Sequence, residues 1–278
     1  MASRATLAIG AVAVAGLAAL VIARGGSSPA GTAAPTTMDA AGPAALPAPT
    51  VPAPAPVAAP AAAQAAVAPT PTSAATPAGG AYAMDDLKLA LADPSDDGTA
   101  RLIDGLASDD VVVVGEAADG LVARRATGAI VALAAIDLDA RPGVIPAVVD
   151  SLGKLGGAAD GAARDAAVTR LLALLRSEKA KGAAAIPSTL LYVYEALGRT
   201  GDPRAVAPLT DELADARVGT AAKVVVVEAL ARLGATGSRD ALAALRARLV
   251  GAPSPDAFEA ELQRDLIAAI DQALGALR

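Results

Sequence analysis

A short segment of this chain, residues 195–213, contains a helix end, a turn and a helix start in an order that leaves few possible folds. Before Gly201, apolar residues recur every three or four positions, which predicts a helix with one apolar face. Gly201 suits a left-handed helix cap, Asp202 can cap the next helix, and Pro203 fits its first position. Two amphipathic helices joined by such a turn pack face to face, and each keeps a second side that needs a neighbour.

The same pattern recurs along the chain. Residues 228–249 repeat it, and Ser238 is expected to cap a helix there as Asp202 does in the first copy. Each repeat is marked by a leucine that follows a small residue, with a polar residue two positions before it. These anchor leucines are Leu121, Leu152, Leu197, Leu230 and Leu274. Self-similarity at roughly 30–45 residues is typical of a solenoid.

The stretch ALGRTGDPRAVAPLTDEL, residues 196–213, and more loosely residues 229–249, resemble the short HEAT repeats of bilin-lyase-like proteins. The resemblance covers about residues 87–277. It implies an all-α fold, a right-handed α-α superhelix of about five helix pairs, in which the anchor-bearing second helix of each pair lines the concave face. Members of this family are mostly scaffolds and adaptors, and a minority handle bilin chromophores.

A short helix near residues 85–92 is expected to precede the helix pairs. The predicted pairs are 98–107 with 110–124, 127–136 with 142–155, 162–177 with 186–199, 203–215 with 219–233, and 238–250 with 257–277. The valine run 111–114 favours a strand by itself, but the similar run 224–227 directly precedes an anchor leucine, so we predict helix for both. Extra residues near 177–185 and 251–256 are expected to form loops on one rim, because equivalent loops of a solenoid share an edge.

Acidic side chains recur two positions before the anchor leucines. They are Asp119, Asp150, Glu195 and Glu228. On stacked helices they would form an acidic stripe along the concave face and attract a basic partner; the alternative is that each carboxylate is simply solvated. Tyr194 is expected in the core, whereas Tyr192 is expected nearer the concave surface, where it could contact a protein or peptide partner.

One segment, residues 93–104, has oxygen-bearing side chains at the spacing of a calcium loop. Asp93, Ser95, Asp97 and Asp104 occupy positions one, three, five and twelve of an EF-hand-like loop. Proline at the second position, aspartate at the last and the lack of a second hand count against this interpretation. The alternative is a turn between helices in which Asp96 or Asp97 caps the next helix. We favour that alternative and expect no metal.

The first eighty or so residues predict a tether. Residues 1–24 contain a predominantly apolar run, 5–23, which at about 1.5 Å per residue nearly spans a bilayer core of roughly 30 Å. This run is expected to be a transmembrane anchor, or alternatively a cleaved signal peptide. Residues 25–82 form an Ala/Pro-rich, low-complexity stretch expected to be a disordered linker. The predicted repeat domain, 83–278, would then lie outside the cytoplasm in the cell envelope, or be secreted after cleavage.

Composition narrows the possible functions. The chain has no histidine and no cysteine, which removes the usual general base, the commonest metal ligand and all thiol chemistry. A net charge of −6 argues against a nucleic-acid partner, because phosphate neutralisation needs clustered Lys and Arg. Ser151 and Lys154 have the spacing of an acyl-enzyme motif, but its companion motifs are missing.

These observations predict a non-catalytic, membrane-tethered scaffold without a cofactor, which binds a protein or peptide on the concave face or the rim of a helical solenoid. Two alternatives remain open at the level of sequence. One is a chromophore-handling protein like the bilin lyases, which would need a deep pocket with convergent polar groups. The other is a structural spacer of the cell envelope, which would show an unpatterned surface.

Overall fold

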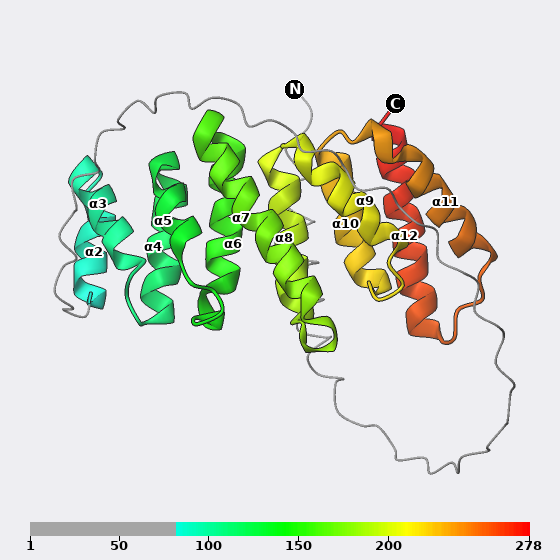
Figure 1. The fold of residues 1–278 in the computed structure, drawn as a ribbon, viewed down its shortest axis with the longest axis horizontal. Coiled ribbons are helices and arrows are strands. Elements are labelled where there is room, and N and C mark those ends of the chain that lie inside the picture. Colours follow the sequence, from blue (N-terminus) through cyan, green and yellow to red (C-terminus); the bar gives the residue numbers. More distant parts are fainter. Residues whose placement is uncertain (1–81) are drawn as a thin grey trace, which may run out of the picture. The chain divides into compact units, whose positions relative to one another are not determined.

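Helices account for all the regular secondary structure in the part of the chain that the computed structural model describes, residues 82–278. The α-helices there are α2 (Met84–Ala92), α3 (Asp96–Gly105), α4 (Val111–Ala123), α5 (Ile130–Ala135), α6 (Ile145–Ala158), α7 (Gly161–Ala180), α8 (Pro187–Thr200), α9 (Val206–Ala214), α10 (Thr220–Arg232), α11 (Arg239–Gly251) and α12 (Ala257–Ala276). Short 3-10 turns precede α5, α6, α8, α9 and α11: η1 (Thr127–Ala129), η2 (Pro142–Val144), η3 (Gly182–Ala184), η4 (Pro203–Ala205) and η5 (Thr236–Ser238). The predicted all-α fold is therefore confirmed (Figure 1).

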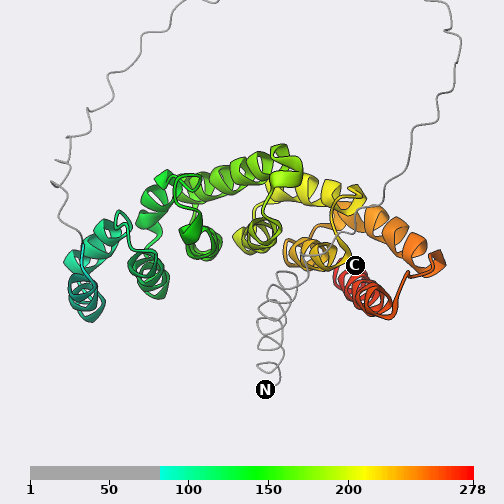
Figure 2. The ribbon, with the colours of Figure 1, turned by 90° about the horizontal axis from the view of Figure 1, so that it is seen from below.

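The helices of residues 82–278 form two layers. Within one layer, α4, α6, α8, α10 and α12 contact one another in chain order, and each packs against the odd-numbered helix before it. Figure 2 shows that this helical unit is a curved row, with the even-numbered helices along its inner side and α3, α5, α7, α9 and α11 along its outer side. Helix α2 contacts both α3 and α4, and so stands at the start of the row.

The five predicted helix pairs correspond to α3 with α4, α5 with α6, α7 with α8, α9 with α10, and α11 with α12. The valine runs 111–114 and 224–227 are helical, as predicted, because Val113, Val114 and Val226 are buried by the neighbouring helices. One expectation was wrong. Residues 177–180 do not belong to a loop, since α7 continues to Ala180 and uses them for an additional helical turn.

The turns follow the predicted chemistry in one copy and not in the other. Gly201 is left-handed, with φ of 69°, and Asp202 accepts a hydrogen bond from the backbone N–H of Arg204 at 2.9 Å. In the second copy the left-handed residue is Gly234. Counting from it places Ala235, not Ser238, at the position of Asp202. The expectation that Ser238 caps α11 was therefore wrong, and its buried hydroxyl instead donates to the carbonyl of Ala235.

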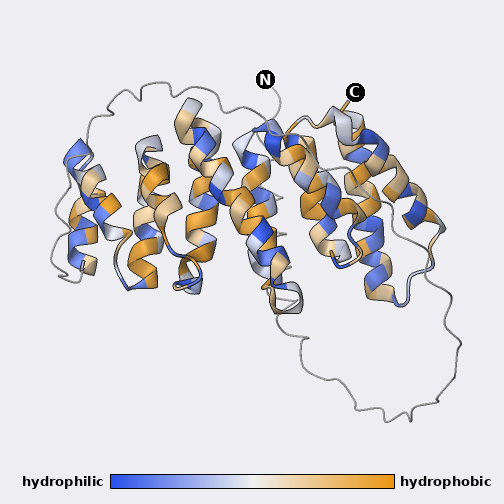
Figure 3. Ribbon diagram, in the orientation of Figure 1, coloured by the Kyte–Doolittle hydropathy of each residue, from blue (hydrophilic) through white to orange (hydrophobic). Residues whose placement is uncertain are grey.

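The core follows the anchor register. Four anchor leucines, on α4, α6, α8 and α10, are fully buried, whereas Leu274 is only partly buried because α12 ends the row. The neighbouring small residues let the inner helices approach closely: a Cβ added to Gly153 would lie 2.7 Å from the Cα of Ala196, and one added to Gly198 would lie 2.7 Å from the Cα of Ala229. In Figure 3 the hydrophobic colour is concentrated at the beginning of α4 and in the middle of α10.

The predicted anchor at 5–23 and nearly all of the predicted linker lie outside the described residues. Within residues 82–278, none of the helices is both long enough and apolar enough to cross a membrane.

Candidate functional site

Two regions of the helical unit carry the candidate site residues: the inner face of the row and a cavity at its rim. On the inner face, the four predicted acidic side chains lie on four successive inner helices. They are Asp119 on α4, Asp150 on α6, Glu195 on α8 and Glu228 on α10. The structure therefore places them on neighbouring helices of one layer, as the anchor register predicts.

Half of this acidic stripe is neutralised within the protein. Arg199, one turn after Glu195 on α8, forms ion pairs with both Glu195 and Asp150 and so joins α6 to α8. Lys154 adds a second cation to Asp150 at 2.6 Å. These basic residues sit at helical spacing from the acidic ones, so the sequence contained a signal for these pairs that the stripe prediction left out.

The other two carboxylates of the stripe form no ion pair with any residue in 82–278. Asp119 is exposed on α4. Glu228 is exposed on α10. Neighbouring protein atoms nevertheless remove part of the solvent around its carboxylate, and this desolvation raises the pKa of Glu228 above its ordinary value. The charge of Arg232 opposes this rise in the pKa of Glu228, and the charge of Glu195 adds to it.

The two tyrosines of α8 occupy different environments. Tyr194 is fully buried, as predicted, and its hydroxyl donates a 2.9 Å hydrogen bond to the buried carboxylate of Glu212. Tyr192 is partly buried and packs against the core. Its exposed part leaves it available to a partner, and its contact role stays a prediction.

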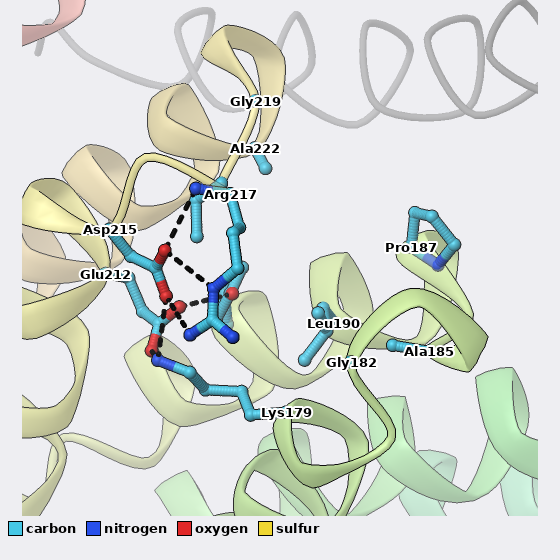
Figure 4. Close-up of a pocket in the computed structure, with 12 residues that line it drawn as sticks. Lys179, Gly182, Ala185, Pro187, Leu190, Glu212, Asp215, Arg217, Gly219 and Ala222 are labelled. Atoms are coloured by element: carbon cyan, nitrogen blue, oxygen red, sulfur yellow. Dashed lines mark hydrogen bonds and ion pairs between the residues drawn. The ribbon is translucent and has the colours of Figure 1, made fainter. Parts of the chain in front are cut away.

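A cavity of about 620 Å³ lies at the rim where the α7–α8 connection meets the α9–α10 connection (Figure 4). Its walls are residues of α7, η3, α8, α9 and α10 and of the segments between them. They are Lys179, Gly182, Ala185, Pro187, Leu190, Tyr194, Glu212, Asp215, Arg217, Val218, Gly219 and Ala222. Figure 4 shows the charged side chains on one side of the cavity, opposite Pro187 and Leu190.

The charged side of this rim cavity is a connected network. Glu212, almost fully buried, accepts hydrogen bonds from the Lys179 ammonium at 2.5 Å and from the Tyr194 hydroxyl. Asp215 accepts from Arg217 through the backbone N–H, Nε and Nη2, at 2.9, 3.1 and 2.8 Å. These bonds hold the pKa of Asp215 well below its ordinary value. Burial, together with the charge and hydrogen bond of Glu212, raises the pKa of Tyr194.

A second buried carboxylate fixes the α7–α8 connection. Glu178 is fully buried and accepts hydrogen bonds from Lys181 at 2.6 Å and from the backbone N–H of Ile186 at 3.3 Å. The insertion that the sequence placed on the rim is therefore held by two ion pairs at the end of α7, Lys179 with Glu212 and Lys181 with Glu178. The sequence indicated the insertion but not the two buried carboxylates, Glu178 and Glu212, because nothing in the sequence marks a glutamate as buried.

The calcium-loop interpretation of residues 93–104 is wrong in its geometry. Asp97 and Asp104 lie within α3, so the twelve-residue loop that would wrap a calcium ion is not formed. The segment is a turn between helices, and its cap is Ser95, whose hydroxyl accepts from the N–H of Gly98 at 3.4 Å. Asp93 supports the turn by accepting from the N–H of Ser95. In residues 82–278 no cluster of three potential acidic ligands could hold a metal ion.

The Ser151 hydroxyl is fully buried in α6 and is therefore not accessible to a substrate, and the ammonium of the exposed Lys154 is engaged with Asp150.

Comparison with known proteins adds no further constraint on the site. No family model matches the chain, and no curated protein matches it. The assignment of function therefore rests on the inner face and the rim cavity alone.

Proposed function

We propose that this chain is a non-catalytic scaffold or adaptor that binds a basic protein or peptide along the concave face of a HEAT-like solenoid. The anchor leucines and the small residues around them repeat on successive inner helices, which supports a right-handed α-α superhelix of the HEAT type. A row of repeats offers a long concave surface, and such surfaces are used to bind extended partners.

The observation that carries this proposal is the state of Glu228. Its carboxylate has lost solvent to the surrounding helices and yet forms no direct ion pair within residues 82–278, although the charge of Arg232 on the same helix partly offsets the effect of desolvation on its pKa. An unpaired, partly desolvated charge lowers the stability of the folded state, so its retention on a binding face favours a function. A lysine or arginine of a partner would supply the missing pair.

Asp119 extends the same argument to the other end of the row. It is exposed on α4, two inner helices before α8, and forms no ion pair with any residue in 82–278. Between these carboxylates lie Asp150 and Glu195, whose two charges are offset by Arg199 and Lys154. A partner that bridges the row would therefore meet free negative charge at α4 and α10, with a nearly neutral stretch between them.

The proposal includes a location. Residues 5–23 would anchor the protein in a membrane or direct its secretion, and residues 25–82 would hold the helical unit away from the bilayer in the cell envelope. Support for this part comes from the sequence pattern alone.

A charge-reversal capture experiment tests the proposal. The full chain would be used to recover partners from envelope extracts, with the variant Asp119→Lys/Glu228→Lys beside it. The matched control is Asp104→Lys/Asp211→Lys, which makes the same change in net charge at exposed carboxylates of the outer helices α3 and α9.

We expect the same basic partner with the wild type and the control, and its loss with the inner-face variant, at unchanged helicity. Recovery that is equal for all three proteins would exclude the concave face as the binding surface. Loss with both variants would show a non-specific charge effect and would also contradict the proposal.

A further inference from the structure

We propose that the rim cavity between α8 and α10 is a binding site for a small aliphatic carboxylate, an anionic group joined to an apolar body. This inference does not depend on the concave-face function. It starts from an inventory of hydrogen-bond donors and acceptors around the cavity, because a ligand must supply what the walls leave unsatisfied.

Both carboxylates of the cavity are already engaged by donors of the protein. Both oxygens of Glu212 accept hydrogen bonds, one from Lys179 and the other from Tyr194. Both oxygens of Asp215 are occupied by Arg217, and the Lys179 ammonium lies a further 3.5 Å from one of them. Glu212 and Asp215 are also the least exposed charged side chains here, at 2% and 15%. A cationic ligand would find its counterions occupied and covered.

The donors of the cavity are not all used. A guanidinium carries five N–H groups, and Arg217 spends one at Nε and one at Nη2 on Asp215. No residue in 82–278 accepts from its Nη1. The Arg217 side chain is 72% exposed, so these donors are open to a ligand. Lys179 donates one hydrogen bond to Glu212 and forms a longer ion pair with Asp215 at 3.5 Å, so at least one of its three N–H groups has no acceptor in residues 82–278.

The free donors are arranged for a carboxylate. A guanidinium edge presents two parallel N–H groups, which match the two oxygens of a carboxylate. In Figure 4 the guanidinium of Arg217 and the ammonium of Lys179 lie close together on the charged side of the cavity. Helix α10 begins beside them after Gly219, which has no side chain to cap it, so the positive end of the helix adds to the attraction.

The opposite side of the cavity is apolar. Pro187 and Leu190 of α8 face the charged side chains, and Ala222, which lies near Arg217 on the other side, is a further apolar residue of the lining. A volume of about 620 Å³ is in the range of small-molecule sites. The cavity is bounded by the two helix connections, which favours a compact ligand over an extended peptide. An aliphatic chain on the apolar wall with its carboxylate at Arg217 satisfies both sides.

Calorimetric titration of the full chain with octanoate, and with octanamide as its neutral analogue, tests this proposal. We expect saturable binding of octanoate. Octanamide should bind at least about tenfold more weakly, because it lacks the charge that strengthens the hydrogen bonds of the carboxylate. Arg217→Gln should weaken octanoate binding by about tenfold or more. Ala222→Met, which lengthens a side chain that lines the cavity without changing a charge, should weaken octanoate binding by about tenfold or more.

The matched control is Arg204→Gln. Arg204 makes the same bidentate pair with the aspartate two residues before it, Asp202, but does not line the cavity. Octanoate affinity equal to that of the wild type is expected in this variant, and circular dichroism checks that each variant is folded. Absence of octanoate binding, equal binding of octanamide, or unchanged binding in Arg217→Gln and Ala222→Met would each overturn the proposal.

A final arm separates two sources of the same chemistry. A short peptide that ends in a free leucine carboxylate is compared with its amidated form. Octanoate binding with no preference between the two peptides supports the small-molecule site. Tight binding of the acid peptide without octanoate binding would overturn it in favour of a site for polypeptide C-termini.

Discussion

Replacing Gly198 by alanine tests how closely α8 and α10 pack on the inner side of the row. A Cβ at this position would lie 2.7 Å from both the Cα and the Cβ of Ala229 and 3.3 Å from its carbonyl oxygen. The Cα and the carbonyl oxygen belong to the backbone of α10 and cannot rotate away. The two helices would have to separate by several tenths of an ångström, and the contacts of the buried Leu197 and Leu230 would loosen with them.

The expected magnitude is the sum of two opposing effects. Overpacking of a well-packed core costs about 1–3 kcal/mol. Alanine in a helix interior gains about 0.5–1 kcal/mol over glycine. Gly115→Ala in α4 isolates the second effect, because the nearest atom to its added Cβ is the Cβ of Ala147 at 3.9 Å, an ordinary contact. Gly115→Ala should therefore stabilise the protein, and Gly198→Ala should be less stable than Gly115→Ala by about 1–3 kcal/mol.

Urea unfolding followed by circular dichroism at 222 nm measures both free energies of unfolding in the full chain. The comparison uses the difference between the two variants, so that the helix-propensity gain cancels. If Gly198→Ala stabilised the protein as much as Gly115→Ala, the close approach of α8 and α10 would be refuted, and with it the role that we assign to the small residues beside the anchor leucines.

Three further predictions follow from the described residues. Leu197→Ala should cost about 2–5 kcal/mol, because Leu197 is fully buried; a cost below about 1 kcal/mol in urea unfolding would contradict the anchor register. Arg125→Gly should stabilise the protein by about 1 kcal/mol, since Arg125 is left-handed, with φ of 54°, at the position that Gly201 fills in its own repeat; a lower midpoint of thermal unfolding would count against this. Glu228→Gln should be more stable than the wild type at pH 7. Because desolvation raises the folded-state pKa of Glu228, this difference in the free energy of unfolding should disappear as the pH falls below the ordinary glutamate pKa of about 4.3. A stability difference that grew in acid would contradict the raised pKa of Glu228.

Local sequence was sufficient for the helices and for one of the turns. Gly201, Asp202 and Pro203 each act through their own backbone or the next few residues, so their roles could be predicted without knowledge of the packing. The anchor leucines could be found for the same reason, since a 3.6-residue period reports one buried face. Four of the five proved fully buried, and Leu274 differs only because the row ends there.

The sequence was a poorer guide to which residue occupies the cap position of a turn and to where a helix ends. Ser238 has a capping side chain, but the cap position is fixed by the left-handed Gly234, four residues earlier. The same limit explains residues 177–180. An excess of residues between two anchor leucines shows that something is inserted, but not whether it extends a helix or forms a loop.

The sequence by itself determined the all-helical class, the order of the helix pairs and the chemical groups that the chain lacks, because these depend on composition and on short-range periodicity. Only the tertiary structure decided which charges are free. Arg199 reaches Asp150 from 49 residues away, and Lys179 reaches Glu212 from 33 residues away. Such contacts join successive repeats, so the carboxylates left unpaired on the inner face and the donors left open at the rim emerge only when the helices stack.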